Sequence, residues 1–219
     1  MNDAGKVTLY YAPRSRSTGT LTLLEEMGVP YDLKVLNLRA GDQRQPAFLS
    51  INPMGKVPTL VHQGQVVTEQ VAIYIYLSDL FPDAKLSVPA GDPLRGSFLR
   101  WMTFYAACME PACTDKSMKR ETPPRSQSGY GDYDTVIGAV NAQLEKGPYF
   151  LGDRMTAADI LWGTALSWLT LWDLVPKLPA IVSYAERITT RPIVARVRER
   201  DAALAAEHEK AVAAKSAAQ

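Results

Sequence analysis

The β-strand pattern of this sequence stops near residue 85, and that change constrains the fold more than any other feature. Up to residue 82, short β-type runs alternate with helical segments in the order βαβαββα, which predicts a mixed sheet. Residues 83–91 contain proline and glycine and are expected to be a linker. Residues 92–219 show helical periodicity only. The expected fold class is therefore α/β followed by an all-helical domain.

Composition excludes several classes of protein. The formal net charge of +1 lacks the basic excess of a nucleic-acid-binding protein. The longest apolar runs are too short to span a bilayer, and the N-terminus has no signal pattern. The two cysteines, Cys108 and Cys113, do not resemble a secreted disulfide framework, and His62 and His208 are isolated from other metal ligands. We expect a cytoplasmic protein with no nucleic-acid partner, no membrane partner and no metal.

The segment at residues 52–61 reads NPMGKVPTLV and places Pro58 at the start of a strand. Proline cannot donate a ladder hydrogen bond, so a first strand position suits it. If the bond before Pro58 is cis, the backbone N–H and C=O of Val57 face outward and can pair with a bound peptide. The alternative is an ordinary trans bond. The frequency of cis bonds favours this alternative, because only about 5–6% of X-Pro bonds are cis.

A second segment, TEQVAIYIYL, begins a helix directly after a strand. The N-terminus of a helix attracts a carboxylate, whereas Glu69 attracts an ammonium group. Glu69 and Gln70 together therefore suit the two ends of an α-amino acid. The structural alternative is that Thr68 caps the helix and that the helix dipole favours a carboxylate at Glu69.

A third segment, at residues 150–162, carries Thr156 and Asp159 at the spacing of a capping box. This interpretation is structural, and we assign the pair no chemistry.

At these separations the three segments resemble the soluble glutathione transferase superfamily, and the match covers essentially the whole chain. The sequence looks like a bacterial, serine-type member. The resemblance implies a thioredoxin-like domain at residues 1–82, an electrophile-binding helical domain at residues 92–219, a cis bond before Pro58 and a homodimer. It also implies glutathione as co-substrate. The residues expected to bind glutathione are Lys56, Val57, Pro58, Glu69 and Gln70. The family usually has serine where this chain has Gln70, whose amide can still donate to a carboxylate.

The activating group is expected in the segment YYAPRSRSTGT, residues 10–20, because family members carry a tyrosine, serine or cysteine there. The segment has no cysteine, so a mixed disulfide with the protein is not expected. Alignment on the proline puts Ser15 at the serine-type position and Arg16 at the cysteine-type position, with Ser17 beside it. Ser15, Ser17 and Arg16 are the catalytic candidates, and capping of the first helix is the alternative for both serines.

The electrophile is expected to bind between the domains, against the first helix of the second domain. Trp101, Tyr105, Cys108 and Met109 are the candidates for a site that takes a hydrophobic small molecule. The alternative for each is a place in the helical core. The expected activity is glutathione transfer to that electrophile. Two alternatives stay open: a non-catalytic protein of the same fold that binds glutathione or another ligand, and a scaffold for protein interactions.

Overall fold

The structure is a computed structural model that describes residues 5–121 and 123–217. Its contacts divide the chain into two compact units. One unit consists of the chain up to Ala84 together with the segment from Pro192 onward, and the other is Lys85–Arg191. The expected boundary assigned everything after residue 91 to the helical domain. In the structure the last helix, α9 (Pro192–Ala217), joins the N-terminal unit because it packs on α1 (Ser17–Met27).

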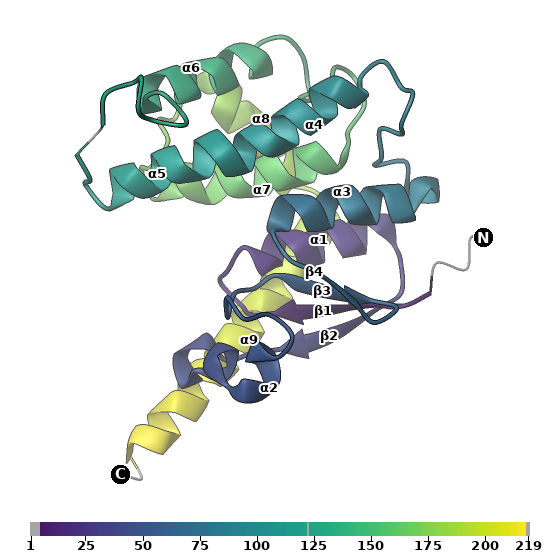
Figure 1. Ribbon diagram of the computed structural model, residues 1–219, viewed down its shortest axis with the longest axis vertical. Helices are drawn as coiled ribbons and strands as arrows, with labels where there is room; N and C mark the ends of the chain where they lie inside the picture. Colours follow the sequence, from purple (N-terminus) through teal and green to yellow (C-terminus); the bar gives the residue numbers. More distant parts are fainter. Residues whose placement is uncertain (1–4, 122, 218–219) are drawn as a thin grey trace. The chain divides into compact units, whose positions relative to one another are not determined.

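The N-terminal unit is built on a four-stranded sheet in the order β2-β1-β3-β4 (Figure 1). β1 pairs in parallel with β2, and the β1–β3 and β3–β4 pairs are antiparallel. The predicted mixed sheet and the order βαβαββα are therefore confirmed. The strands are β1 (Val7–Tyr11), β2 (Tyr31–Val35), β3 (Thr59–His62) and β4 (Gln65–Val67).

The helices of this unit lie in the segments that connect the strands or follow the last strand. Besides α1 and α9, they are α2 (Pro46–Leu49), α3 (Gln70–Leu80) and the 3-10 turns η1 (Leu38–Ala40), η2 (Asp42–Arg44) and η3 (Pro82–Ala84). Along β1, residues 7, 9 and 11 are buried and alternate with half-buried ones, as a strand with one core face requires. α1 ends at Gly28, whose φ of 64° allows its amide to bond the carbonyl of Leu24.

The second unit is helical over nearly all of its regular structure. Its helices are α4 (Arg95–Phe104), the π-helical turn η4 (Tyr105–Met109), α5 (Glu110–Ser117), α6 (Tyr133–Leu144), α7 (Ala157–Leu171) and α8 (Pro179–Thr189). Most residues of α7 are buried, as its apolar sequence predicts.

The predicted capping box at the start of α7 is confirmed. The Thr156 amide donates to the Asp159 carboxylate at 2.7 Å. The same carboxylate accepts the Phe150 amide at 2.9 Å and the Tyr184 hydroxyl at 2.9 Å. Asp159 is fully buried, so these donors compensate for its lost hydration.

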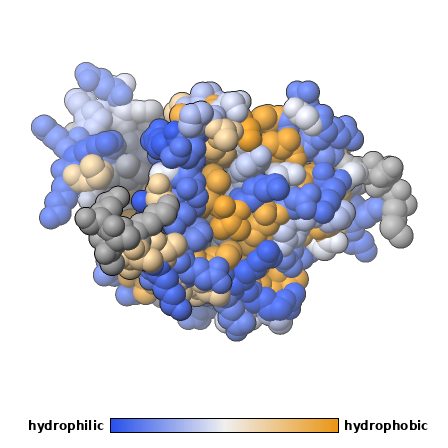
Figure 2. Space-filling view, turned by 90° about the horizontal axis from the view of Figure 1, so that it is seen from below, coloured by the Kyte–Doolittle hydropathy of each residue, from blue (hydrophilic) through white to orange (hydrophobic). Residues whose placement is uncertain are grey.

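Hydrophobic residues also reach the surface. Figure 2 shows them on one face, with hydrophilic residues around them. Among the residues that the structure describes, no helix is both long and apolar enough to cross a bilayer.

Candidate functional site

The loop between β1 and α1 holds the two serines singled out from the sequence. Ser17 is fully buried, and its Oγ accepts the Ala12 amide at 2.9 Å. Ser15 is half-buried, and its Oγ accepts the Ser17 amide at 3.2 Å. The first helical residue is Ser17, so neither serine occupies the N-cap position, which is Arg16.

The hydroxyls of Ser15 and Ser17 make three short contacts that need a hydroxyl proton, but they have only two such protons. Both Ser15 Oγ and Ser17 Oγ lie near the Ala12 carbonyl, at 2.7 and 3.0 Å, and they lie 2.5 Å from each other. Each hydroxyl has a single proton. Two protons therefore serve two of the three contacts at any moment. When Ser17 donates to the Ala12 carbonyl, the proton of Ser15 can point elsewhere.

Two other hydroxyls of the segment are already used inside the unit. The Tyr11 hydroxyl donates to the carboxylate of Asp201 on α9, and the Thr18 hydroxyl donates to the same oxygen at 2.5 Å. Burial, and to a smaller extent the hydrogen bond to Asp201, raises the pKa of Tyr11 far above its usual value. Tyr11 is thus a poor candidate for a group that contacts sulfur.

Arg16 is exposed, and its backbone carbonyl accepts the side-chain amide of Gln70 at 3.0 Å. This bond links the start of α3 to the β1–α1 loop. An amide nitrogen has two hydrogens, and the bond to Arg16 uses one of them.

The peptide bond before Pro58 is cis, as the resemblance implied. No hydrogen bond within the described part of the chain takes up the backbone N–H or C=O of Val57. The neighbouring Lys56 carbonyl is instead occupied by Asn52 at 3.0 Å and by the Thr59 hydroxyl at 2.9 Å. Val57 thus retains both of its backbone groups for a partner.

The alternative in which Thr68 caps α3 is wrong. The helix begins at Gln70, so the N-cap is Glu69, which has φ 63° and makes no side-chain capping bond. A positive φ is uncommon in a residue with a side chain. The exposed Glu69 carboxylate therefore lies at the helix start without being used as a cap.

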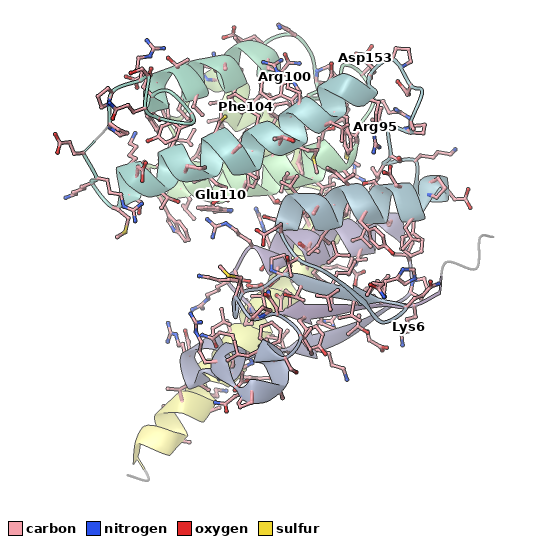
Figure 3. The ribbon with its side chains drawn as sticks, in the orientation of Figure 1. Lys6, Arg95, Arg100, Phe104, Glu110 and Asp153 are labelled. Carbon is pink, nitrogen blue, oxygen red and sulfur yellow. The ribbon has the colours of Figure 1, made fainter. Side chains whose placement is uncertain are left out.

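The four candidates for the electrophile site differ in burial. Trp101, Tyr105 and Met109 are almost fully buried, whereas Cys108 keeps part of its surface exposed. The Trp101 carbonyl accepts the Trp162 indole N–H at 3.1 Å, and the Tyr105 hydroxyl bonds Glu110 at 2.5 Å (Glu110 is labelled in Figure 3). This burial favours the core alternative for those three residues. Burial also raises the pKa of the Cys108 thiol, which disfavours its thiolate.

A hollow of about 230 Å³ lies beside the β1–α1 loop. It is lined by residues 12–14, residues 37–39 and one face of α9. Sequence reasoning did not predict it, because three segments far apart in the chain form its walls. Among the residues described, no cluster of three or more metal-ligating side chains is found.

Comparison with known proteins identifies the family. The chain matches the family models "Glutathione S-transferase, N-terminal domain" at residues 5–79 and "Glutathione S-transferase, C-terminal domain" at residues 123–200. It is 32% identical to a glutathione transferase of Methylococcus capsulatus, with TM-score 0.74 over 90% of this chain and 98% of that one. The chain belongs to the glutathione S-transferase superfamily.

Other members of this superfamily resemble the chain over similar lengths. The glutathione S-transferase GstA of Escherichia coli O157:H7 is 29% identical over 85% of this chain and 94% of its own. A glutathione transferase from Phanerochaete chrysosporium, solved with oxidized glutathione, is 25% identical. Its TM-score is 0.75, with 93% of this chain and all of that chain covered. The prediction of a glutathione transferase is confirmed at the level of the family.

Proposed function

We propose that this glutathione transferase is of the serine type and uses the Ser15 hydroxyl to stabilise the thiolate of bound glutathione. The observation that carries the proposal is the difference between the two serines. Ser17 is fully buried and holds the Ala12 amide, so its hydroxyl is out of reach of a ligand. Ser15 is half-buried and shares its acceptor with Ser17, so its proton can turn to sulfur while the loop stays bonded.

The energies are sufficient without a cysteine or a metal. A free thiol has a pKa near 8.5, and lowering it by about two units takes roughly 2.7 kcal/mol. A hydrogen bond to a charged group contributes about 1.5–3 kcal/mol. The N-terminus of α1 adds about 0.3–1 kcal/mol. The first turn of α1 has no acidic residue of its own to offset that helix dipole.

For the rest of glutathione, we assign the cysteinyl backbone to Val57 and the γ-glutamyl end to Glu69 and Gln70, beside Lys56 and Pro58. The unused backbone groups of Val57 support the first assignment. The carboxylate of Glu69 at the start of α3 supports the second, because it complements an ammonium group. Gln70 is the first residue of α3, where the helix N-terminus favours a carboxylate such as that of the γ-glutamyl group.

The second substrate is proposed to be a hydrophobic small-molecule electrophile, and the assembly a homodimer in the cytoplasm. Of the residues expected to line the electrophile site, Cys108 keeps exposed surface. Turnover of a chloronitroaromatic compound tests the transfer reaction, and light scattering tests the dimer. Binding of glutathione without turnover across a panel of electrophiles would instead support a non-catalytic binding protein.

Replacement of Ser15 by alanine tests the serine-type mechanism. We expect Ser15→Ala to raise the thiol pKa of bound glutathione by about one to two units, because a hydrogen bond to the anion is lost. The thiolate absorbance of the complex, followed against pH, measures this shift. Ser183→Ala, an exposed serine of α8, is the matched control. An unchanged titration in Ser15→Ala would remove Ser15 from the role.

A further inference from the structure

We propose that Asp201 of α9 is a positioning residue that holds the β1–α1 loop in the conformation that presents Ser15. The proposal rests on the function proposed for Ser15 and deepens it. We call the group formed by Asp201 and its donors Tyr11, Arg14 and Thr18 the α9 clamp.

The donors of the α9 clamp come from both sides of Ser15. Before it, the Tyr11 hydroxyl and the Arg14 amide bond the Asp201 carboxylate, the amide at 3.1 Å from Oδ2 and 3.2 Å from Oδ1. After it, the Thr18 hydroxyl bonds Oδ1 at 2.5 Å. One carboxylate therefore holds the end of β1, the middle of the loop and the first turn of α1.

The clamp also holds a backbone conformation that the sequence does not favour. Arg14 has φ 54°, a left-handed value that costs a residue with a side chain some free energy. Its amide is bonded by Asp201, and its guanidinium pairs with Glu209 on the same helix at 2.7 Å. Both ends of Arg14 are thus held by α9, and Ser15 follows directly.

Burial makes this carboxylate hard to replace. Asp201 is 8% exposed, so loss of its side chain leaves the Arg14 amide and two hydroxyls without their acceptor. Water or a new loop conformation must then satisfy them. A new loop conformation moves Ser15, and water in place of the carboxylate holds it less firmly, because Ser15 lies between the bonded residues.

The direction in which the thiol pKa of bound glutathione changes in an Asp201 variant separates a positioning role from a purely electrostatic one. A negative charge near the helix start opposes a thiolate, so removal of charge alone lowers the thiol pKa of bound glutathione. Loss of positioning raises that pKa, because Ser15 no longer donates to sulfur. We expect Asp201→Ala to raise the pKa by on the order of one unit. Asp201→Asn removes the charge but keeps an oxygen acceptor, so the thiol pKa of glutathione bound to this variant is expected to be equal to that of the wild type or slightly lower. Glu207→Ala, which removes an exposed carboxylate from the same helix, is expected to change nothing.

A double variant tests whether Asp201 acts through Ser15. In a Ser15→Ala background, Asp201→Ala is expected to cause no further rise in the thiol pKa, because the hydroxyl it positions is gone. Affinity for S-methylglutathione, which has no thiol, is expected to fall by less than about threefold in the folded Asp201→Ala protein. Of the groups assigned to the tripeptide backbone, Gln70 is tied to this loop through the Arg16 carbonyl, whereas Val57 and Glu69 are assigned contacts outside it. If Asp201→Ala does not fold, Thr18→Val removes one donor on the helix side and is expected to raise the pKa by a smaller amount.

An unchanged or lowered thiol pKa in Asp201→Ala, with a raised one in Ser15→Ala, would overturn the positioning role and leave the proposed function standing. An unchanged pKa in Ser15→Ala would overturn the role of Ser15. A rise in Asp201→Ala that persists in full in the double variant would overturn positioning through Ser15.

Discussion

At the scale of single residues, two serines in one loop have different environments. Ser17 is sealed inside the unit and binds the Ala12 amide, whereas Ser15 lies at the edge and shares its acceptor. A hydroxyl in the interior stabilises the loop, and one at the edge is placed to meet a ligand. The same amino acid therefore serves different roles two positions apart.

Replacement of Ser17 tests the structural half of this assignment. We expect Ser17→Ala to lower the free energy of unfolding by about 1–3 kcal/mol, because the buried Ala12 amide loses its acceptor. Urea denaturation followed by circular dichroism measures the change. The exposed Ser183→Ala is expected to stay within about 0.5 kcal/mol of wild type. Equal stability of Ser17→Ala and Ser183→Ala would contradict the assignment.

At the scale of elements, the close packing of α7 on α8 depends on one glycine. A Cβ at Gly163 would lie 2.5 Å from the Cβ and Cγ1 of Ile188, so even a methyl group has no room. Glycine usually weakens a helix interior by about 1 kcal/mol relative to alanine. Here the close approach of the two helices outweighs that propensity.

Gly163→Ala is expected to lower the free energy of unfolding by about 1–3 kcal/mol through overpacking. A second change, Ile188→Ala, relieves the contact, so the double variant is expected to lose less stability than the sum of the two single variants. Gly138→Ala in α6 is the control, because a Cβ there meets nothing within 4 Å and is expected to be neutral or slightly stabilising. Additive losses in the double variant would show that the contact is not the cause.

At the scale of the whole molecule, the chain returns to its first unit after completing the second. α9 starts 108 residues after Ala84 and packs on α1. Its Asp201 bonds the β1–α1 loop, and its own Val194 and Val197 are buried. Helix α9 is thus part of the thioredoxin-like unit.

A chain that stops after Arg191 is expected to lose several kcal/mol of stability, a large part of the roughly 5–15 kcal/mol typical of a domain. The loss arises because α1 and the β1–α1 loop lose the helix packed on them. Hydrogen exchange at the amides of β1 and α1 measures it locally. A chain that stops after Lys210 is the control, because residues 211–214 have no fully buried side chain. Equal protection in the two truncated chains would contradict the role of α9.

Much of the architecture followed from patterns within short stretches. The order of strands and helices, the capping box at Thr156 and Asp159, and the family itself were predictable from local spacing. The N-cap at Glu69, with its positive φ, was not predictable in this way, because residue preferences alone favoured Thr68 as the cap. The burial of Trp101, Tyr105 and Met109 was foreseen as the core alternative. Helical spacing did not show that Trp162 packs against Trp101 and Tyr105.

By itself the sequence determined what each segment is: hydrophobic periodicity and caps act over a few residues, so strands, helices and their order can be inferred from neighbours in the chain. Only the tertiary structure decided what each side chain meets. It buried Ser17 and left Ser15 at the edge, and it brought Asp201 to Tyr11 across a separation of 190 residues. Such contacts depend on how distant segments pack, and no local pattern contains that information.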